Sequence, residues 1–144
     1  MAAKPITSHA EAEWKGSVKE GGGQVRFGGG AFQGDYSWAG RFETGKGTNP
    51  EELLAAAHAG CFSMQLSGLL TANGTPPTAI HTKAAVTILH GVGITKSVLD
   101  VRAEVHGIDA EKFAEIATKA KDICPVTKAL AGIPEITLHA HLKR

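Results

Sequence analysis

The feature that most constrains the fold is the stretch at residues 49–73, NPEELLAAAHAGCFSMQLSGLLTAN, which we predict to be one long helix. Asn49 is a favourable N-cap, and Pro50 suits the first helical position, where its missing N–H has no cost. Glu52 stands three residues after Asn49 and can reach back to complete a capping box. At the far end, Gly74 and the prolines after it prevent the helix from continuing. The rest of the chain must therefore pack around this helix.

The middle of the helix, residues 55–61 (AAAHAGC), consists of small residues around His58 and ends at Cys61. The helix is apolar on almost every side, a pattern typical of a buried helix. Small residues let another backbone approach closely, so we expect Cys61 in the most tightly packed part of the molecule. Taken alone, Cys61 fits a small apolar core residue, as most buried free cysteines do.

Length and composition limit the possible classes of function. The chain has 144 residues, which predicts one domain over residues 1–144 that folds without a disulfide or metal. The formal net charge is +1, and no basic stripe with interleaved aromatic residues appears, so nucleic acid is a poor partner. No secretion signal is present, and the long helix carries Glu51, Glu52, His58 and Gln65. We therefore expect a cytoplasmic protein with no membrane association.

Hydrophobic periodicity and turn residues predict a mixed order of elements. Three short strands precede the long helix; a hairpin, two further helices and a last strand follow it. The predicted ranges are strands at 11–15, 23–27 and 35–42, the helix at 49–73, strands at 81–90 and 94–106, helices at 110–122 and 126–131, and a strand at 134–142. This order indicates an α+β fold with a mainly antiparallel sheet.

Cys124 has the more informative local context of the two cysteines. Pro125 at the first helical position makes Cys124 the N-cap of a short helix, with backbone N–H groups facing its sulfur. That environment stabilises a thiolate and lowers the pKa of the thiol. Two cysteines without a secretion signal do not form a structural disulfide framework, so a disulfide between them would be transient redox chemistry.

Thiol redox chemistry also needs a charged group that holds a thiolate. The candidates are Arg41, predicted at the end of a strand, and His58, one turn before Cys61. Each also has an ordinary explanation, Arg41 as a surface residue and His58 as a hydrogen-bonded core histidine. From the residues alone, both explanations stay open.

The motif NPEELLAAAHAGCFSM, together with the downstream CPVTKAL, closely resembles the OsmC/Ohr family of thiol peroxidases. The lead-in RFETGKGT and the strand around Trp14 resemble the OsmC branch, osmotically inducible protein C, more than the organic hydroperoxide resistance branch. The likeness extends from about residue 11 to the C-terminus, and both cysteine motifs are highly specific.

The resemblance implies an OsmC-like fold in which long central helices are wrapped by the strands of an intertwined homodimer, with active sites at the subunit interface. It implies that Cys61 is the peroxidatic thiol and Cys124 the resolving thiol, with Glu51 and Arg41 as the carboxylate and arginine of the site. It also implies organic hydroperoxides as preferred substrates over hydrogen peroxide. No bound cofactor or metal is expected, and the reductant is an external dithiol or lipoyl group.

Helix geometry supports the homodimer independently. Glu51 and Cys61 are ten residues apart, or ~15 Å along one helix, so they cannot meet within one chain. Two copies crossing antiparallel near Ala56 would bring Glu51 of one subunit beside Cys61 of the other. Because a carboxylate repels a thiolate, we assign Glu51 to orient Arg41, which would hold Cys61 as a thiolate and polarise the peroxide.

The expected reaction follows from these roles. The Cys61 thiolate attacks the distal oxygen of a hydroperoxide, releases the alcohol and becomes a sulfenic acid. Cys124 then condenses with it to an intrachain disulfide and water, and an external dithiol reduces that disulfide. Candidates for an apolar substrate wall, or alternatively plain core, are Phe42, Leu54, Phe62 and Met64.

Two other classes of function fit parts of the sequence. A metal-binding protein could use His139 and His141 on one face of the last strand, but no further residues with metal-ligand spacing accompany them. A family member that kept the fold while binding a small apolar molecule is the other alternative. The presence of both cysteines with Glu51 and Arg41 disfavours it.

Overall fold

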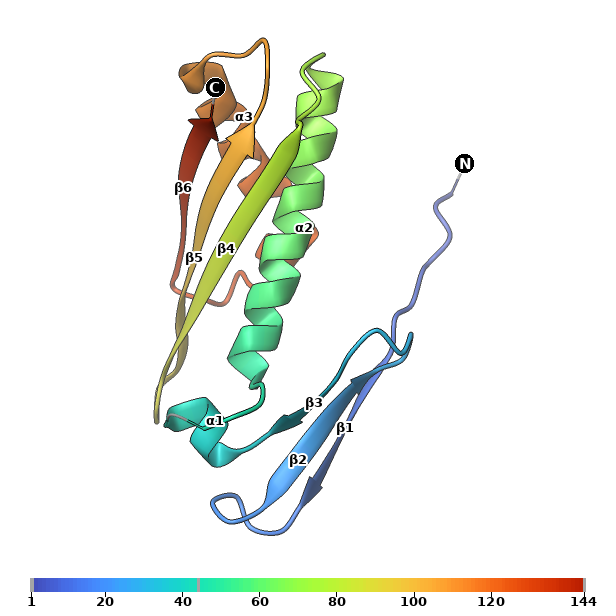
Figure 1. The fold of residues 1–144 in the computed structure, drawn as a ribbon, viewed down its shortest axis with the longest axis vertical. Coiled ribbons are helices and arrows are strands. Elements are labelled where there is room, and N and C mark those ends of the chain that lie inside the picture. Colours follow the sequence, from blue (N-terminus) through green and yellow to red (C-terminus); the bar gives the residue numbers. More distant parts are fainter. Residues whose placement is uncertain (1, 44, 144) are drawn as a thin grey trace. The chain divides into compact units, whose positions relative to one another are not determined.

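The computed structural model describes residues 2–43 and 45–143 and shows an α+β chain that divides into two compact units after Pro50. Three strands and two helices are followed by two strands, two helices and a last strand (Figure 1). Within these residues three of the four strand pairings are antiparallel, which confirms the predicted class and the mainly antiparallel pairing. The single domain over residues 1–144 stays a prediction.

The first unit contains an antiparallel sheet of order β1-β2-β3, formed by Ala10–Lys15, Gly22–Phe27 and Gln33–Tyr36. Gly23 on the central strand pairs with Trp14 on one side and Tyr36 on the other. The two aromatic rings pack with centroids 5.2 Å apart. A Cβ atom on Gly23 would lie 2.5 Å from the Tyr36 ring and 2.7 Å from the Trp14 ring, so only glycine permits this packing.

The predicted strand at 35–42 is wrong beyond Tyr36, because the chain turns into helix α1 at Trp38–Phe42. Ser37 caps this helix, its hydroxyl accepting a hydrogen bond from the N–H of Gly40 at 3.0 Å. Trp38 and Phe42 stand four residues apart and pack with ring centroids 4.5 Å apart, as an i, i+4 pair does on a helix. Arg41 therefore lies on a helix and not at the end of a strand.

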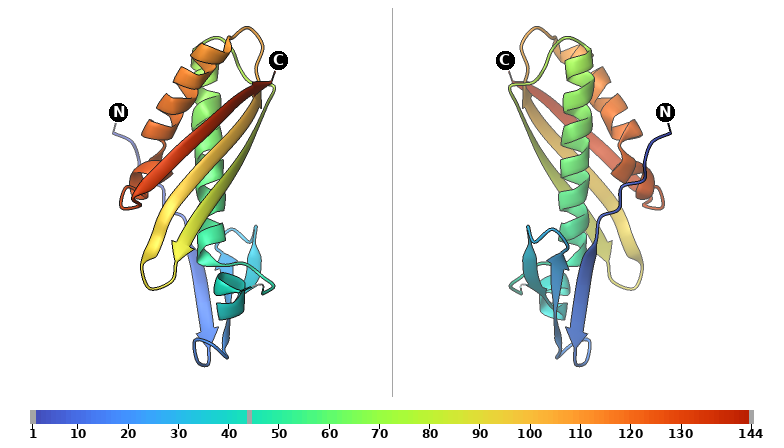
Figure 2. Two further views of the ribbon diagram at one scale, coloured as in Figure 1. Left: turned by 90° about the vertical axis from the view of Figure 1, so that its left-hand side faces the viewer. Right: turned by 90° about the vertical axis from the view of Figure 1, so that its right-hand side faces the viewer.

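The second unit combines a mixed sheet with three helices. Its sheet has the order β4-β5-β6, with β5 antiparallel to β4 and parallel to β6. Helices α2 and α3 lie on the same face of this sheet, as the two views in Figure 2 show. The elements are α2 (Pro50–Ala72), β4 (Ala79–Leu89), β5 (Gly93–Glu104), α3 (Ala110–Ile123), α4 (Pro125–Ala129) and β6 (Glu135–Lys143).

The core of the second unit fills the space between the sheet and these two helices. Strand β5 directs every second side chain into it, and the stripes of α2 and α3 complete it. The core residues are Phe62, Leu66 and Leu70 from α2, Leu99, Val101, Ala103 and Val105 from β5 and its end, Phe113, Ile116, Ala117 and Ala120 from α3, and Cys124. Cys124 is thus part of the best-packed region of the unit.

In the single chain α2 is buried on one face only, which corrects the prediction of burial on almost every side. The buried face follows helical spacing through His58, Phe62, Leu66 and Leu70. The opposite face includes four exposed residues in the middle of the helix, also spaced by four: Ala56, Gly60, Met64 and Gly68. Met64 is 79% exposed, and a Cβ atom on either glycine would meet nothing within 4 Å. We call these four residues the open stripe of α2.

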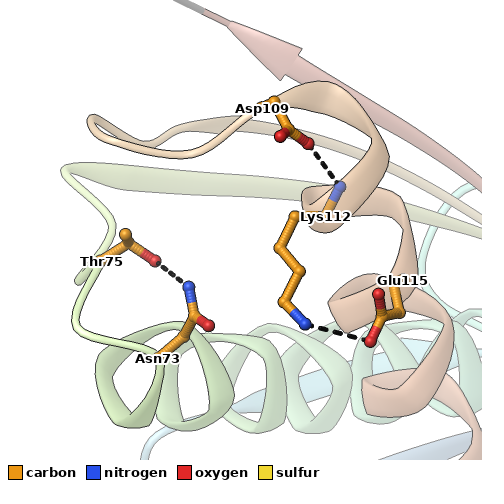
Figure 3. Close-up of polar contacts among 5 residues, drawn as sticks. All are labelled: Asn73, Thr75, Asp109, Lys112 and Glu115. Atoms are coloured by element: carbon orange, nitrogen blue, oxygen red, sulfur yellow. Dashed lines mark hydrogen bonds and ion pairs between the residues drawn. The ribbon is translucent and has the colours of Figure 1, made fainter.

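The helix ends follow the capping residues in the sequence (Figure 3). After α2 the chain reverses through Gly74, whose φ is +81°, and Asn73 donates a hydrogen bond to the hydroxyl of Thr75 at 3.1 Å. Asp109 caps α3, its carboxylate accepting from the N–H of Lys112 at 2.7 Å. The predicted stop of the long helix and the predicted start of α3 are confirmed.

Candidate active site

The fold of the second unit brings the two cysteine sulfurs together. Cys61 lies in the middle of α2, and Cys124 lies at the junction of α3 and α4. Their Sγ atoms are 3.1 Å apart, within hydrogen-bond distance, and both are free thiols. A disulfide has an S–S length of about 2.05 Å, so about 1 Å of approach would join them.

Cys124 is fully buried at the N-terminus of α4. Burial alone would raise the pKa of this thiol, but neighbouring donors outweigh it, and the pKa lies below its ordinary value. These donors are the backbone N–H groups of Thr127 and Val126, the Thr127 hydroxyl and the thiol of Cys61. Cys124 forms no regular side-chain capping bond, yet the predicted position at a helix start, with amides that favour thiolate, is confirmed.

Cys61 is partly exposed, in contrast to Cys124. Burial raises the pKa of Cys61, and the hydrogen bond and negative charge of Cys124 raise it further, while the backbone N–H of Val126 offsets a part. In this chain the thiolate is therefore favoured on Cys124, whereas Cys61 is the more exposed of the two residues. A peroxidatic Cys61 needs a further group that stabilises its negative charge.

His58, one turn before Cys61, is hydrogen-bonded through both ring nitrogens. Its Nδ1 lies 2.8 Å from the hydroxyl of Ser97 on β5, and its Nε2 lies 2.8 Å from the hydroxyl of Thr127 on α4. His58 and Ser97 are fully buried, and burial lowers the pKa of His58. His58 is therefore a neutral core histidine near neutral pH, as the ordinary explanation held, and its partner Thr127 is the third residue after Cys124.

Arg41 belongs to the first unit, where it lines a pocket of about 500 Å³. Its guanidinium carbon lies 5.2 Å from the centroid of the Phe42 ring, an arginine–aromatic contact. The pocket walls are otherwise largely apolar and include Trp14, Val18, Tyr36, Trp38 and Phe42. One positive group in an aromatic pocket fits a ligand with an apolar body and a polar end.

Glu51 is 5% exposed in the first turn of α2, in the second unit. It lies on the same helix as Cys61, so the helix itself keeps the two apart, as helix geometry requires. The pairing of Glu51 with Arg41 and the approach of Arg41 to Cys61 stay predictions.

The two hydrogen-bond partners of His58 were given no role in the sequence analysis. Thr127 was expected only as part of a short helix, and Ser97 only as part of a strand. The CPVT motif carried a signal for Thr127, because the third residue after an N-cap faces the cap side chain.

Of the four predicted wall residues, Phe62 belongs to the core and Phe42 lines the Arg41 pocket. Among the described residues, no group of three or more His, Cys, Asp or Glu side chains could hold a metal ion.

Sequence and structure comparisons place this geometry in a family. The model of OsmC-like proteins matches residues 43–139, which include Glu51, Cys61 and Cys124. The chain belongs to the OsmC family. Peroxiredoxin OsmC of Escherichia coli (strain K12) is 46% identical over 142 residues, 96% of this chain and 98% of the relative. The predicted resemblance to the OsmC branch is confirmed.

More distant relatives agree with this placement. An organic hydroperoxide resistance protein of Xanthomonas axonopodis pv. citri is 30% identical over 95 residues, 65% of this chain and 67% of the relative. An OsmC-like protein from Mycoplasma pneumoniae has a TM-score of 0.76 at 15% identity, covering 98% of this chain and 100% of its own. At that identity the structural likeness supports the fold alone.

Proposed function

We propose that this chain is a cysteine-based peroxidase that reduces organic hydroperoxides to alcohols and serves in oxidative and osmotic stress defence. The observation that carries the proposal is the pair of free thiols 3.1 Å apart, one accessible and one buried. The family relationship supports it, since relatives at 46% and 30% identity are named a peroxiredoxin and an organic hydroperoxide resistance protein.

Exposure distinguishes the two thiols. We assign Cys61 as the peroxidatic residue, because it is partly exposed whereas Cys124 is fully buried. Its thiolate attacks the distal oxygen, the O–O bond breaks, alcohol leaves and Cys61 becomes a sulfenic acid. Cys124 then forms the S–S bond as the S–O bond of Cys61 breaks, and water is released.

In this proposal Arg41 supplies the positive charge that stabilises the Cys61 thiolate. The pKa of Cys61 is raised in the chain, so a guanidinium beside it would favour the thiolate and polarise the peroxide. Glu51 holds that guanidinium in a bidentate ion pair. Because Glu51 and Cys61 cannot meet along one helix, the complete site forms at the interface of a homodimer.

The Arg41 pocket supports an organic rather than an inorganic peroxide as substrate. A pocket of about 500 Å³ with aromatic walls can bury the apolar body of an organic hydroperoxide, and hydrogen peroxide has no such group. The reductant is an external dithiol or lipoyl group, and the chemistry uses no bound cofactor or metal.

We place the enzyme in the cytoplasm as a soluble homodimer without nucleic acid or membrane partners. Helix α2 has the length and composition of a membrane span, but it buries Glu51 and His58 and packs one face against the sheet. In a dimer its open stripe is covered by the second subunit instead of by lipid.

A steady-state assay tests this function. The purified protein is given cumene hydroperoxide or hydrogen peroxide, each with dihydrolipoamide or with thioredoxin and its reductase. We expect the highest kcat/KM for the organic peroxide with dihydrolipoamide. Equal turnover of the two peroxides would contradict the assigned substrate class, and no turnover in any combination would contradict the peroxidase assignment.

A further inference from the structure

A line of polar side chains runs from strand β5 to the sulfur pair. Ser97 contacts Nδ1 of His58 at 2.8 Å, and Nε2 of His58 contacts the hydroxyl of Thr127 at 2.8 Å. Thr127 is the third residue after Cys124, at the start of α4, and its side chain is among the groups that lower the pKa of Cys124. The sulfur of Cys124 lies 3.1 Å from that of Cys61. The line joins α2, β5 and α4, and both His58 and Ser97 are fully buried.

The proton inventory of these groups fixes the direction of the line when Cys124 is a thiolate. A thiolate only accepts, so the hydroxyl proton of Thr127 points at Cys124. The Thr127 oxygen is then free to accept from Nε2–H of His58, and Nδ1 accepts from the hydroxyl of Ser97. A neutral imidazole has one donor and one acceptor, so every group in the line is satisfied once.

We propose that His58 is a positioning residue of the resolving step, which fixes the Thr127 hydroxyl so that it donates to Cys124. This proposal rests on the peroxidase function, because the resolving step belongs to the peroxidase cycle. It goes beyond that function by giving His58, Thr127 and Ser97 a role in the step. Without the Nε2–H of His58, the Thr127 hydroxyl is free to rotate toward another acceptor. The Cys124 thiolate would then lose a donor that it cannot replace from water, because it is fully buried.

The Cys124 thiolate attacks the sulfur of the Cys61 sulfenic acid, the S–S bond forms and the S–O bond breaks. Cys124 is oxidised, the sulfenic sulfur is reduced, and hydroxide leaves with the proton released earlier from the Cys124 thiol, giving water. In the reductive half of the cycle, the same hydrogen bond stabilises Cys124 as the leaving thiolate.

Two pairs of substitutions test the line. Thr127→Val removes the hydroxyl and keeps the shape, whereas Thr127→Ser retains it. His58→Gln keeps an N–H near the place of Nε2 and cannot take up a proton, whereas His58→Asn is too short to reach Thr127. The matched control is Thr82→Val, which removes a part-buried hydroxyl from β4, where Thr82 contacts Ser63 at 2.7 Å.

The first readout needs no peroxide. In a Cys61→Ser background, the ultraviolet absorbance of the Cys124 thiolate is titrated against pH. We expect Thr127→Val and His58→Asn to move the titration to higher pH, and Thr127→Ser, His58→Gln and Thr82→Val to leave it near that of the parent. If Thr127 and His58 had only a structural role, the two variants of each residue would not differ in the pH at which Cys124 titrates.

The second readout follows single turnover with both cysteines present. One equivalent of cumene hydroperoxide is added, and the sulfenic acid is trapped with dimedone at increasing times. Thr127→Val and His58→Asn should prolong the lifetime of the sulfenic acid about three- to tenfold. Loss of the hydrogen-bond donor destabilises the Cys124 thiolate, but the higher pKa also makes that thiolate more nucleophilic, which offsets part of the effect. Titrations of Thr127→Val or His58→Asn that match the parent would overturn the proposal, even if the chain proves inactive toward peroxides.

Discussion

Two sulfur atoms 3.1 Å apart have opposite surroundings, and their reactivity follows from that difference. Cys61 is reachable and has a raised pKa, whereas Cys124 is sealed in the core with backbone amides that lower its pKa. Cys61, the cysteine assigned to react with the peroxide, is thus the one that needs a neighbouring group to stabilise its thiolate. The proposed roles of Arg41 and Glu51 follow from this need.

Cysteine substitutions should separate the two roles. Cys61→Ser should abolish peroxide consumption, because no reachable sulfur is left. Cys124→Ser should still consume one equivalent and leave Cys61 as a sulfenic acid, detected as a dimedone adduct by mass spectrometry. Normal turnover by Cys61→Ser, with the adduct on Cys124, would reverse the assignment.

Arg41 and Glu51 should behave as one unit. Arg41→Ala should slow the reaction of Cys61 with cumene hydroperoxide by about 10- to 150-fold, since charge-assisted hydrogen bonds contribute about 1.5–3 kcal/mol. Arg41→Lys should rescue poorly, because an ammonium makes no bidentate pair. Glu51→Ala should resemble Arg41→Ala, and stopped-flow rates should show the double variant no slower than either alone.

A surface arginine provides the control for that cycle. Arg26→Ala removes an exposed guanidinium of β2 that pairs with Glu11 at 3.6 Å, and its rate should equal that of the parent. Additive losses in Arg41→Ala and Glu51→Ala would mean that the two residues act independently.

His58 should make the folded chain sensitive to acid. Burial lowers its pKa in the folded state, so below about pH 6.5 the unfolded chain takes up a proton that the folded chain does not. The free energy of unfolding therefore falls as pH decreases through this range. In urea titrations from pH 7.5 to 5, His58→Gln should lose stability less steeply than the parent. Parallel pH profiles would show that His58 is protonated without cost in the folded chain.

At the scale of single residues, the sequence indicated both cysteines and the cap position of Cys124. It could not show that their sulfurs meet, because 63 positions separate them and the contact depends on how α3 and α4 pack. The hydrogen-bond partners of His58 could not be predicted either, since Ser97 lies 39 residues and Thr127 lies 69 residues away in the sequence.

At the scale of elements, α2 has two unlike faces. His58, Phe62, Leu66 and Leu70 face the core, and the open stripe of Ala56, Gly60, Met64 and Gly68 faces outward. The sequence predicted the limits of this helix well because its capping residues act locally. It could not show which of the two faces stays exposed in the chain, since both are apolar. Helix α1 was mistaken for a strand because five residues, Trp38–Phe42, are too few to show a helical period.

The open stripe should be the crossing point of the proposed homodimer. Ala56→Leu should overpack a close approach of two α2 helices and weaken the dimer by about 1–3 kcal/mol, or about 5- to 150-fold in Kd. Sedimentation equilibrium measures this change. Ala114→Leu, at an exposed position of α3, is the control and should leave the dimer unchanged. A stable monomer of the parent at micromolar concentration would exclude the dimer altogether.

At the scale of the whole molecule, the expected residues of the site are divided between two units. Arg41 lines a pocket in the unit that ends at Pro50, and Cys61 and Cys124 meet in the unit that begins at Glu51. The α+β class followed from the order of elements, whereas the assembly of the site depends on surfaces that no local pattern encodes. The proposed homodimer would cover the open stripe, would bring Glu51 of one subunit near Cys61 of the other, and would supply a positive charge beside Cys61.

The most direct measurement is the fate of the two thiols in a single turnover. The reduced protein is mixed with one equivalent of cumene hydroperoxide without reductant, then quenched, titrated for free thiols and mapped by mass spectrometry of its peptides. We predict the loss of both thiols per chain and one intrachain bond between Cys61 and Cys124, restored to two thiols by dihydrolipoamide. Two thiols that survive the peroxide, or a disulfide only between chains, would contradict the proposed peroxidase cycle.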